Sequence, residues 1–577
     1  MAPFRGVVRW LVGVSCAVQV ASGVGHGAFR TSLTLKDFKE QLAQQEEQNA
    51  RVRARDSNQD LELLYPPHTI QVPIDHFHND SIYEPHVDGT FALHYWFDAS
   101  HYRKGGPVIV LQGGETDGVG RLPFLQKGIV AKLAQATNGL GVILEHRYYG
   151  RSVPTPDLST DNLRFLTTDQ ALADQAYFAQ HVVFPGLEHL NLTSHNTPYV
   201  AYGGSYAGAF VAFLRKLYPD VYWGAIASSG VPEAIYDYWE YYEAARIYAP
   251  KDCVAVTQKL THMVDNILLN KANAPYIQRL KTAFGLGNLT RSDDFANTIS
   301  SGIAGLQGLN WDPAINSTDF GVYCANITSS SVIDPATAGL ESEARELLTA
   351  GGYASEVDAL APRLLNYIAY VNATAVAGCR RQQSRSPSLT QDGCFTNYNS
   401  TFYAQHDLKQ TWRLWAYQYC FEWGYLQTGS GVPESQLPLI SRLIDIPFLS
   451  TVCREAFNIT TPSQVERINK HGGVNISYPR LAHVDGEWDP WRAASPHRIG
   501  LPERESTVSE PFILIDRGVH HWDENGLFPN ETTSKLPPKA VKHAQKEEVA
   551  FVKEWVKEWH KTKGRGHCRP VPKGGKY

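Results

Sequence analysis

A serine surrounded by small residues is the first candidate for chemistry in this sequence. Ser205 lies in the stretch VAYGGSYAGAF, between two apolar runs. A nucleophilic serine must expose its hydroxyl, lie near backbone N–H groups that stabilise an oxyanion, and reach a histidine. A tight turn from a strand into a helix meets these needs when the neighbours are small. These neighbours are Gly203, Gly204, Ala207 and Gly208. We interpret Ser205 as a nucleophile; the alternative is a Gly-rich strand end with an incidental serine.

Two later stretches offer partners for this serine. HVDGEWDPW contains Asp485 and Asp489, and DRGVHHWDENG contains His520 and His521. Hydrolases with a serine turn of this kind place the acid and then the histidine on loops after later strands. Ser205, Asp489 and His520 satisfy that order, whereas Asp485 precedes a glycine and fits a turn better. His520 is therefore the predicted base and Asp489 the residue that orients it, while the second histidine is either structural or part of the pocket.

The oxyanion donors are predicted from the same turn and from a second loop. The N–H of Tyr206 directly follows the nucleophile. The second donor is expected in the loop LQGGETDGVG, where Gly113, Gly114 and Glu115 follow a predicted strand, with Gly114 as the chosen candidate.

The elements around these residues alternate between strands and helices. From Gln71 to about residue 230, short β-branched or aromatic runs bounded by Gly, Pro or Asp predict strands. A strand at 197–204, a turn at Ser205 and a helix at 205–219 form the central part. This alternation predicts an α/β protein with a parallel sheet covered on both faces. Helical patterns, including one at 233–249, dominate residues 231–450. Strand-like texture returns at 475–491 and 510–523.

Composition and periodicity divide the chain into six segments. Arg5 and Arg9 precede an apolar run at 10–21, which is shorter than the roughly 20 residues of a membrane-spanning helix and indicates a secretory signal peptide. The charged stretch at 35–54 is either a loosely docked helix or a propeptide. The predicted segments are a signal peptide (1–28), an N-terminal extension or propeptide (29–66), the first part of the sheet domain (67–230), a helical cap insertion (231–450), the second part of the sheet domain (451–562) and a basic tail (563–577).

Cysteines and glycosylation sequons also indicate export. Six cysteines lie close together in the sequence and are expected to form disulfides whose pairing the sequence leaves open: Cys253, Cys324, Cys379, Cys394, Cys420 and Cys453. The state of Cys568 is open too. Ten N-x-Ser/Thr sequons begin at Asn79, Asn191, Asn288, Asn316, Asn326, Asn372, Asn399, Asn458, Asn475 and Asn530.

Charge and missing motifs exclude several function classes. The formal net charge of −5 gives no strong field for nucleic acid or an anionic membrane. His76 and His78 resemble a metal pair, but they lack a convincing third ligand, and H-E-x-x-H is absent. The P-loop and dinucleotide patterns are absent as well. We therefore expect neither a metal nor a cofactor.

Several strings in this order resemble one known family. GGSYAG, LEHRYYGRS, LQGGETDG, IQVPIDHF, YQYCFEWGYLQT, GEWDPW and GVHHWD are similar to motifs of the lysosomal prolyl carboxypeptidase and dipeptidyl peptidase II family, which includes fungal acid prolyl endopeptidases. The resemblance spans about residues 70–558. It implies an α/β-hydrolase domain with a helical cap inserted after the nucleophile-bearing half. It also implies cleavage after proline by Ser205, Asp489 and His520.

The resemblance suggests further binding residues, each with an ordinary structural alternative. Trp491 would form a wall for a proline ring, or simply pack in the core. Glu115 and Asp117 would bind a free substrate amine, or remain solvated loop carboxylates. Arg147 would meet a substrate carboxylate, or form a structural ion pair. The chain departs from the family at Asp485, where asparagine is common, and in the GGETDG loop, which bears on recognition of the substrate ends.

The resulting expectation is a secreted or vacuolar/lysosomal serine peptidase that acts through an acyl-enzyme. Its substrates are peptides with proline before the cleaved bond, and the family prefers acidic conditions. An exopeptidase, either a carboxypeptidase or a dipeptidyl peptidase, is expected, and the sequence leaves internal cutting open as the alternative. No integral membrane association is expected, and a homodimer is compatible with the resemblance. The alternatives are an esterase or lipase of the same fold, and a non-catalytic binding protein on a hydrolase scaffold.

Overall fold

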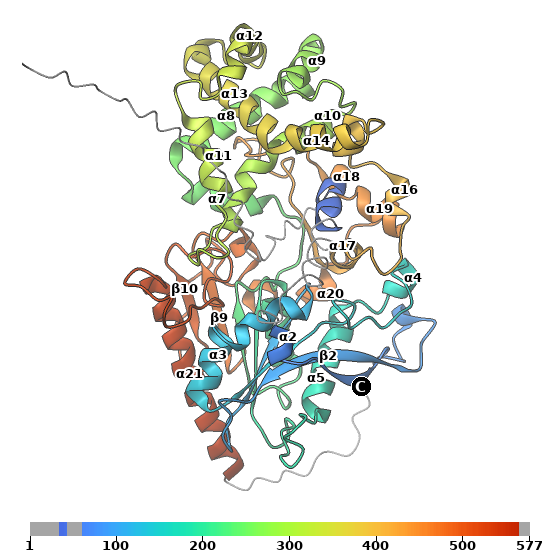
Figure 1. Ribbon diagram of the computed structural model, residues 1–577, viewed down its shortest axis with the longest axis vertical. Helices are drawn as coiled ribbons and strands as arrows, with labels where there is room; N and C mark the ends of the chain where they lie inside the picture. The colour runs from blue at the N-terminus through green and yellow to red at the C-terminus, as the bar shows by residue number, and fades with distance from the viewer. Residues whose placement is uncertain (1–33, 43–60, 565–577) are drawn as a thin grey trace, which may run out of the picture.

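The computed structural model describes residues 34–42 and 61–564 (Figure 1). The predicted signal peptide, most of the predicted N-terminal extension, Cys568 and nearly all of the basic tail lie outside these residues. None of the helices in the described part is long and apolar enough to cross a membrane.

An eight-stranded sheet forms the lower half of the molecule in Figure 1. Its strand order is β1-β2-β4-β3-β5-β6-β9-β10. The strands are β1 (His68–Pro73), β2 (Thr90–Asp98), β3 (Val108–Gln112), β4 (Leu140–Leu144), β5 (Tyr199–Gly204), β6 (Gly224–Ser228), β9 (Leu481–Gly486) and β10 (Phe512–Ile515). The strands from β4 to β10 pair in parallel, but β2 is antiparallel to both β1 and β4. The predicted α/β class is confirmed, and the arrangement is that of an α/β-hydrolase.

Helices cover both faces of the sheet because its central strands are apolar on both sides. Val108 and Val110 of β3 join the core cluster that contains α5 and α6, whereas Ile109 and Leu111 join the cluster that contains α3 and α21. This alternation follows from the period of two in a strand. The covering helices are α3 (Ile129–Thr137), α5 (Thr168–His181), α6 (Tyr206–Leu217) and α21 (Lys539–Gly564).

A large helical insertion separates β6 from its sheet neighbour β9 and lies above the sheet in Figure 1. Its α-helices are α7 (Glu243–Tyr248), α8 (Lys251–Leu269), α9 (Ala274–Ala283), α10 (Ser292–Ile299), α11 (Asp319–Thr328), α12 (Glu341–Ala350), α13 (Val357–Val371), α14 (Ala377–Arg385), α15 (Gln391–Phe395), α16 (Ser400–Tyr403), α17 (Trp412–Gln418), α18 (Ile446–Leu449), α19 (Thr451–Phe457) and α20 (Glu466–Asn469). One prediction was wrong in part: the stretch at 233–249 begins with a strand, β7 (Ile235–Asp237), which pairs with β8 (Gly424–Leu426).

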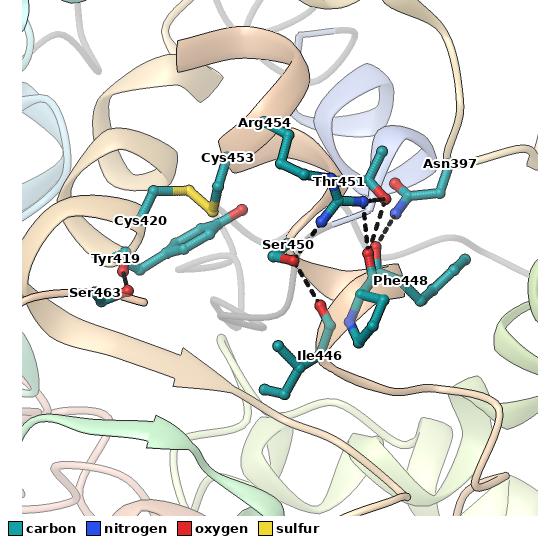
Figure 2. The surroundings of a disulfide bond; sticks show 11 residues. Asn397, Tyr419, Cys420, Ile446, Phe448, Ser450, Thr451, Cys453, Arg454 and Ser463 are labelled. Carbon is teal, nitrogen blue, oxygen red and sulfur yellow. Dashed lines mark hydrogen bonds between the residues drawn. A yellow bond between two sulfur atoms is a disulfide. The ribbon is translucent and has the colours of Figure 1, made fainter. Parts of the chain in front are cut away.

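Three disulfides join the six clustered cysteines within this insertion, which confirms the predicted disulfides and gives their pairing. The pairs are Cys253–Cys324, Cys379–Cys394 and Cys420–Cys453. Figure 2 shows the third pair, in which Cys453 of α19 meets Cys420 of the π-helical turn η10 (Tyr419–Trp423). The turn η10 is therefore tied covalently to α19.

The short N-terminal helix at 35–42 packs inside the insertion. It is the blue helix among α17, α18 and α19 in Figure 1. Leu35 and Phe38 are fully buried, and the Phe38 ring lies 4.8 Å from the ring of Trp412. The Leu35 N–H donates to Asn397 Oδ1 at 3.0 Å. This segment is thus firmly packed, which differs from the loosely docked helix considered from the sequence.

Candidate active site

Ser205 occupies a sharp turn between β5 and α6. Its backbone has φ 61° and ψ −126°, a conformation that non-glycine residues rarely adopt. The Ser205 N–H donates to Ser228 O at 2.9 Å, which holds the turn against β6. A Cβ added to Gly203 would lie 2.2 Å from Ala207 O, and one added to Gly208 would lie 2.8 Å from Gly230 Cα. The small neighbours are therefore required by the close approach of strand and helix.

His520 and Asp489 form a direct pair. His520 Nδ1 lies 2.9 Å from Asp489 Oδ2 and 3.1 Å from Oδ1. The Trp491 N–H donates to Asp489 Oδ1 at 2.9 Å. His520 is 7% exposed and Asp489 1%, so the carboxylate is withdrawn from water while the imidazole keeps a small opening.

The sheet brings this pair to the same edge as the serine turn. Ser205, Asp489 and His520 follow β5, β9 and β10, which run parallel, so their carboxyl ends share one edge. Direct packing agrees with this placement, because a Cβ on Gly204 would lie 3.2 Å from Cγ of His521. The segment that carries both histidines therefore touches the serine turn.

Electrostatics keep this pair in the state that a base requires. Burial alone would raise the pKa of Asp489, but the His520 charge and hydrogen bonds from His520, Ser229 and the Trp491 N–H lower it overall. Burial lowers the pKa of His520, and Asp489 opposes this shift only in part. The imidazole thus holds its proton less tightly than an ordinary histidine, beside a carboxyl group whose pKa is lower than usual.

Ser229 is a site residue that the sequence reasoning missed. It follows β6, between the serine turn and Asp489 in the sheet, and has a positive φ of 43°. Its Oγ accepts the N–H of His521 at 2.9 Å and its hydroxyl bonds Asp489. The available signal was its position in AIASSGVP, directly after a strand whose end lies at the same sheet edge.

Asp485 is not a turn residue, as the sequence suggested. It lies inside β9, is 1% exposed, and its Oδ2 is 2.6 Å from Nδ1 of His497. The glycine that follows it still belongs to the strand. Asp485 therefore pairs with a different histidine and leaves Asp489 as the partner of His520.

The predicted oxyanion donors differ in their availability. Tyr206 is the first residue of α6, so its N–H has no carbonyl one turn earlier in the helix to bond. The Gly114 N–H, however, donates to Gln112 Oε1 at 2.6 Å. In the described structure Gly114 is therefore not a free donor, which differs from the expectation. The reason is a side chain two residues earlier, whose direction the sequence pattern does not reveal.

Charged groups lie beside the serine turn on one side. His521 Nδ1 lies 2.9 Å from Glu524 Oε2, and Arg121 lies 3.8 Å from the same carboxylate. Burial lowers the pKa of His521, but Glu524 outweighs this effect and the pKa is raised overall. Loss of hydration raises the pKa of Glu115, which interacts with Arg121 and His521. Asp117 is exposed, and its Oδ1 caps the turn at Val119 N at 2.8 Å.

Trp491 belongs to an aromatic cluster shared with the insertion. Its ring stacks on Tyr238 at 5.3 Å and lies 6.2 Å from the ring of His520. Its Nε1 donates to Gln307 Oε1 at 3.1 Å, and Tyr241 donates to the same oxygen. Trp491 is 3% exposed. It is thus rigidly held next to the imidazole.

Two other candidates have structural partners. Arg147 is fully buried and forms a bidentate pair with Asp174 at 2.6 and 2.7 Å. His76 also bonds Asp174 through Nε2 at 2.8 Å. Within the described residues, one group of side chains has the spacing of metal ligands: Asp75, His78 and His86. Their nitrogen and oxygen ligand atoms all lie within 4.8 Å of one another. Asp75 accepts hydrogen bonds from the Phe77 N–H, from His86 and from the Gln170 amide.

A buried carboxyl pair lies behind the site. Asp523 accepts hydroxyl hydrogen bonds from Tyr202 at 2.6 Å and Ser228 at 2.5 Å, one from each strand beside the serine turn. Glu548 of α21 interacts with Asp523, and both are fully buried. Burial first, and then Asp523, raise the pKa of Glu548 well above its usual value, whereas Lys132 lowers it only partly. Glu548 therefore holds its proton to higher pH than an ordinary glutamate.

Glu548→Gln is expected to stabilise the protein at pH 7.5 relative to the wild type. The folded state holds the Glu548 proton more tightly than the unfolded state, so wild-type stability falls as pH rises above the unfolded pKa. Glutamine cannot ionise, which removes a penalty of about 1–3 kcal/mol. Urea unfolding at pH 4 and pH 7.5 measures this, with Glu547→Gln on the same helix as control. Equal differences in unfolding free energy at both pH values would contradict the raised pKa of Glu548.

Comparison with known proteins adds the family. Residues 72–539 match the family model described as serine carboxypeptidase S28. The chain belongs to this family. Three relatives agree with the assignment. A probable extracellular serine carboxypeptidase of Arthroderma benhamiae is 54% identical, covering 90% of this chain and 71% of the relative. The serine protease vicPa of Bipolaris victoriae is 30% identical, covering 88% and 91%. The human lysosomal Pro-X carboxypeptidase is 25% identical, covering 86% and 89%.

Membership of the S28 family makes the chain a serine-type peptidase, in preference to the esterase and binding-protein alternatives. It confirms the resemblance stated from the motifs.

Proposed function

We propose that this S28 peptidase removes residues from the carboxyl end of peptides by cutting after proline, with Ser205 as nucleophile, His520 as base and Asp489 as the orienting acid. The observation that carries the proposal is the His520–Asp489 pair. This pair lies at the sheet edge where Ser205 joins β5 to α6. A strained serine at such a turn with a carboxylate-held imidazole nearby suits acyl transfer.

The mechanism follows from proton positions. A carboxylate accepts from Nδ1 of His520, so Nε2 is the atom left to take the Ser205 proton. The serine oxygen then attacks the carbonyl carbon, and the oxyanion meets the Tyr206 N–H. His520 passes its proton to the leaving amine as the peptide bond breaks, which leaves an acyl-serine. Water attacks the ester by the same route in reverse. Gly114 would serve as second donor only after its bond to Gln112 opens.

Proline specificity is proposed from the surroundings of Trp491. Its ring lies beside His520 and is held by Tyr238 and Gln307. A rigid aromatic face next to the base suits the flat, compact proline ring. The human relative is named a Pro-X carboxypeptidase, which supports the same proposed proline specificity.

Carboxyl-end recognition is proposed from the charges beside the turn. His521 has a raised pKa and therefore stays protonated to higher pH than an ordinary histidine, and Arg121 lies near it. Both offer positive charge for a free carboxylate. Binding should strengthen as pH falls and His521 becomes fully charged, which favours acid activity. Glu115 and Asp117 provide the competing hypothesis, in which a free substrate amine is bound and dipeptides are released. The names of the relatives support a secreted or lysosomal location.

The test is mass-spectrometric mapping of cuts in a peptide pool at pH 4, 5.5 and 7. One half of the pool carries amidated carboxyl ends and the other acetylated amino ends. We expect cuts after proline that disappear with amidation and persist with acetylation. Loss of cutting on acetylation alone would instead favour amine recognition, and cuts without proline preference would contradict the assigned pocket.

A further inference from the structure

The side chain of Tyr206, the residue after the proposed nucleophile, is anchored by the helical insertion. Gln418 of α17 donates from Nε2 to the Tyr206 hydroxyl at 3.0 Å. The same hydroxyl lies 3.0 Å from His146 Nε2. On the other side of the amide, the Tyr149 hydroxyl donates to Gln418 Oε1 at 2.5 Å. One residue of the insertion thus bonds two tyrosines of the sheet domain.

Every hydrogen bond in this group has a defined direction. His146 Nδ1 lies 2.8 Å from the Arg147 carbonyl, which only accepts, so Nδ1 carries the hydrogen and Nε2 accepts from Tyr206. Burial lowers the pKa of His146 to about 4, so the ring is neutral over most of the acidic range. The Tyr206 hydroxyl accepts from Gln418 and donates to His146, so it is fully satisfied. Such a buried network admits one arrangement.

The insertion also holds the ring of Tyr206 and the backbone around Gln418. Trp415 and Trp423 pack against the Tyr206 ring at 5.4 and 5.2 Å. Directly after Gln418 the chain forms the π-helical turn η10, a rare form that is often found at functional sites.

The position of that turn is fixed from two sides. The Cys420–Cys453 disulfide ties η10 to α19, and the Ser463 hydroxyl donates to Tyr419 O at 2.7 Å, as Figure 2 shows. Within the same turn Glu422 accepts from the backbone and hydroxyl of Thr168. Gln418 is therefore presented to Tyr206 from a rigid segment.

We propose that Gln418 is a positioning residue for catalysis: by holding the Tyr206 side chain, it fixes the direction of the Tyr206 N–H that stabilises the oxyanion. The inference rests on the proposed function, in which Ser205 is the nucleophile. Tyr206 is the first residue of α6, and the Ser205 carbonyl in the same peptide group accepts the N–H of Gly208 at 2.9 Å and of Ala209 at 3.1 Å. The backbone of α6 and the anchored Tyr206 side chain therefore hold this peptide group together. The insertion would then complete the catalytic machinery, in addition to covering it.

The expected size of the effect is moderate. Loss of an oxyanion donor costs about 10²- to 10³-fold in kcat, and a displacement of about 1 Å can cost about 10²-fold. Removing the anchor should displace the N–H without deleting it. We expect kcat to fall by about 10- to 100-fold in Gln418→Leu and Tyr206→Phe. KM should change little, because the contact with the substrate ground state is unaffected.

Gln418→Glu provides the decisive comparison. A buried carboxylic acid in its neutral form has one acceptor and one donor oxygen, as the glutamine amide has Oε1 and Nε2, whereas the carboxylate lacks the donor. The kcat of this variant, divided by that of the wild type at each pH, should therefore rise as pH falls. Glu115, Glu422 and His146 also face Tyr206, and this ratio cancels their titration. The ratio for Gln418→Leu should stay low at every pH.

Tyr199→Phe on β5 is the matched control. Its hydroxyl donates to Leu192 O at 2.7 Å, so it loses one buried hydrogen bond at the far end of the same strand. The melting temperature should fall by similar amounts in Tyr206→Phe and Tyr199→Phe, whereas kcat should fall only in Tyr206→Phe.

Wild-type kcat in Gln418→Leu and Tyr206→Phe would overturn the inference, as would a low, pH-independent ratio for Gln418→Glu. These results remain distinguishable from failure of the proposed function. Labelling of Ser205 in the wild type by a fluorophosphonate, with cleavage after proline, supports that function whatever the Gln418 variants do.

Discussion

Ser205→Ala should lower kcat for cleavage after proline by at least about 10⁴-fold while leaving the folded structure intact. Without the hydroxyl no acyl-enzyme forms, and what remains is the contribution of binding and the oxyanion donors. The alanine methyl fits the same turn, since the strain at φ 61° lies in the backbone. Residual activity is measured with a fluorogenic proline peptide, and the acyl-enzyme is sought by mass spectrometry.

The serine variant needs controls for contamination and for general damage. Ser384→Ala removes an exposed hydroxyl on α14 and should keep full activity. The loss of kcat in His520→Ala should be about as large as in Ser205→Ala. The double variant should lose little more activity, because the effects of substitutions in residues that act as a unit are not additive. His521→Ala should chiefly raise KM if it binds the substrate carboxylate. An equal loss of kcat in His521→Ala and a mild one in His520→Ala would exchange the roles of the two histidines.

Asp489→Asn should reduce kcat by about 10⁴-fold, and this is the second large effect. An amide at this position can donate to Nδ1 and so stabilises the wrong tautomer of His520, with the proton on Nε2. It also removes the negative charge that opposes the burial effect on the pKa of His520. The activity remaining should therefore show its acid limit at lower pH than the wild type. Steady-state kinetics from pH 3.5 to pH 7 measure both changes.

Asp485→Asn is the matched control four residues earlier. Asp485 is equally buried and equally bonded to a histidine, but its partner is His497. The variant should lose about 1–3 kcal/mol of stability and keep kcat within a few-fold. A 10⁴-fold loss in Asp485→Asn with an active Asp489→Asn enzyme would show that the acid is assigned to the wrong residue.

Local patterns in the sequence were sufficient to predict the serine turn. The strand at 197–204, Ser205 and the following helix are adjacent in sequence. The small residues around them indicate directly that the strand and the helix approach closely. The order of Asp489 and His520 after later strand-like runs predicted the second half of the site. The role of both residues stays a prediction until the variants are measured.

Features that join distant parts of the chain were not predictable. Ser229 lies in none of the family-like strings, and Gln418 lies in YQYCFEWGYLQT, which gives no sign of its role. The meaning of both residues comes from contacts with Asp489 and Tyr206 that only the folded sheet and insertion create. The pairing of the cysteines and the antiparallel placement of β2 are also long-range. Gly114 illustrates the same limit at short range, because the direction of the Gln112 side chain decides whether its N–H is free.

The order of the strands in the sheet determines when, during synthesis and folding, the parts of the candidate active site can come together. The serine turn is synthesised early, but β9 and β10, which deliver Asp489 and His520, follow the entire insertion and must return to the edge of β6. A serine without its base is a poor nucleophile. With the proposed roles of these three residues, a growing or incompletely folded chain would be inert toward the proteins around it, and the capacity to cut peptides would arise only when the last part of the domain closes on the first.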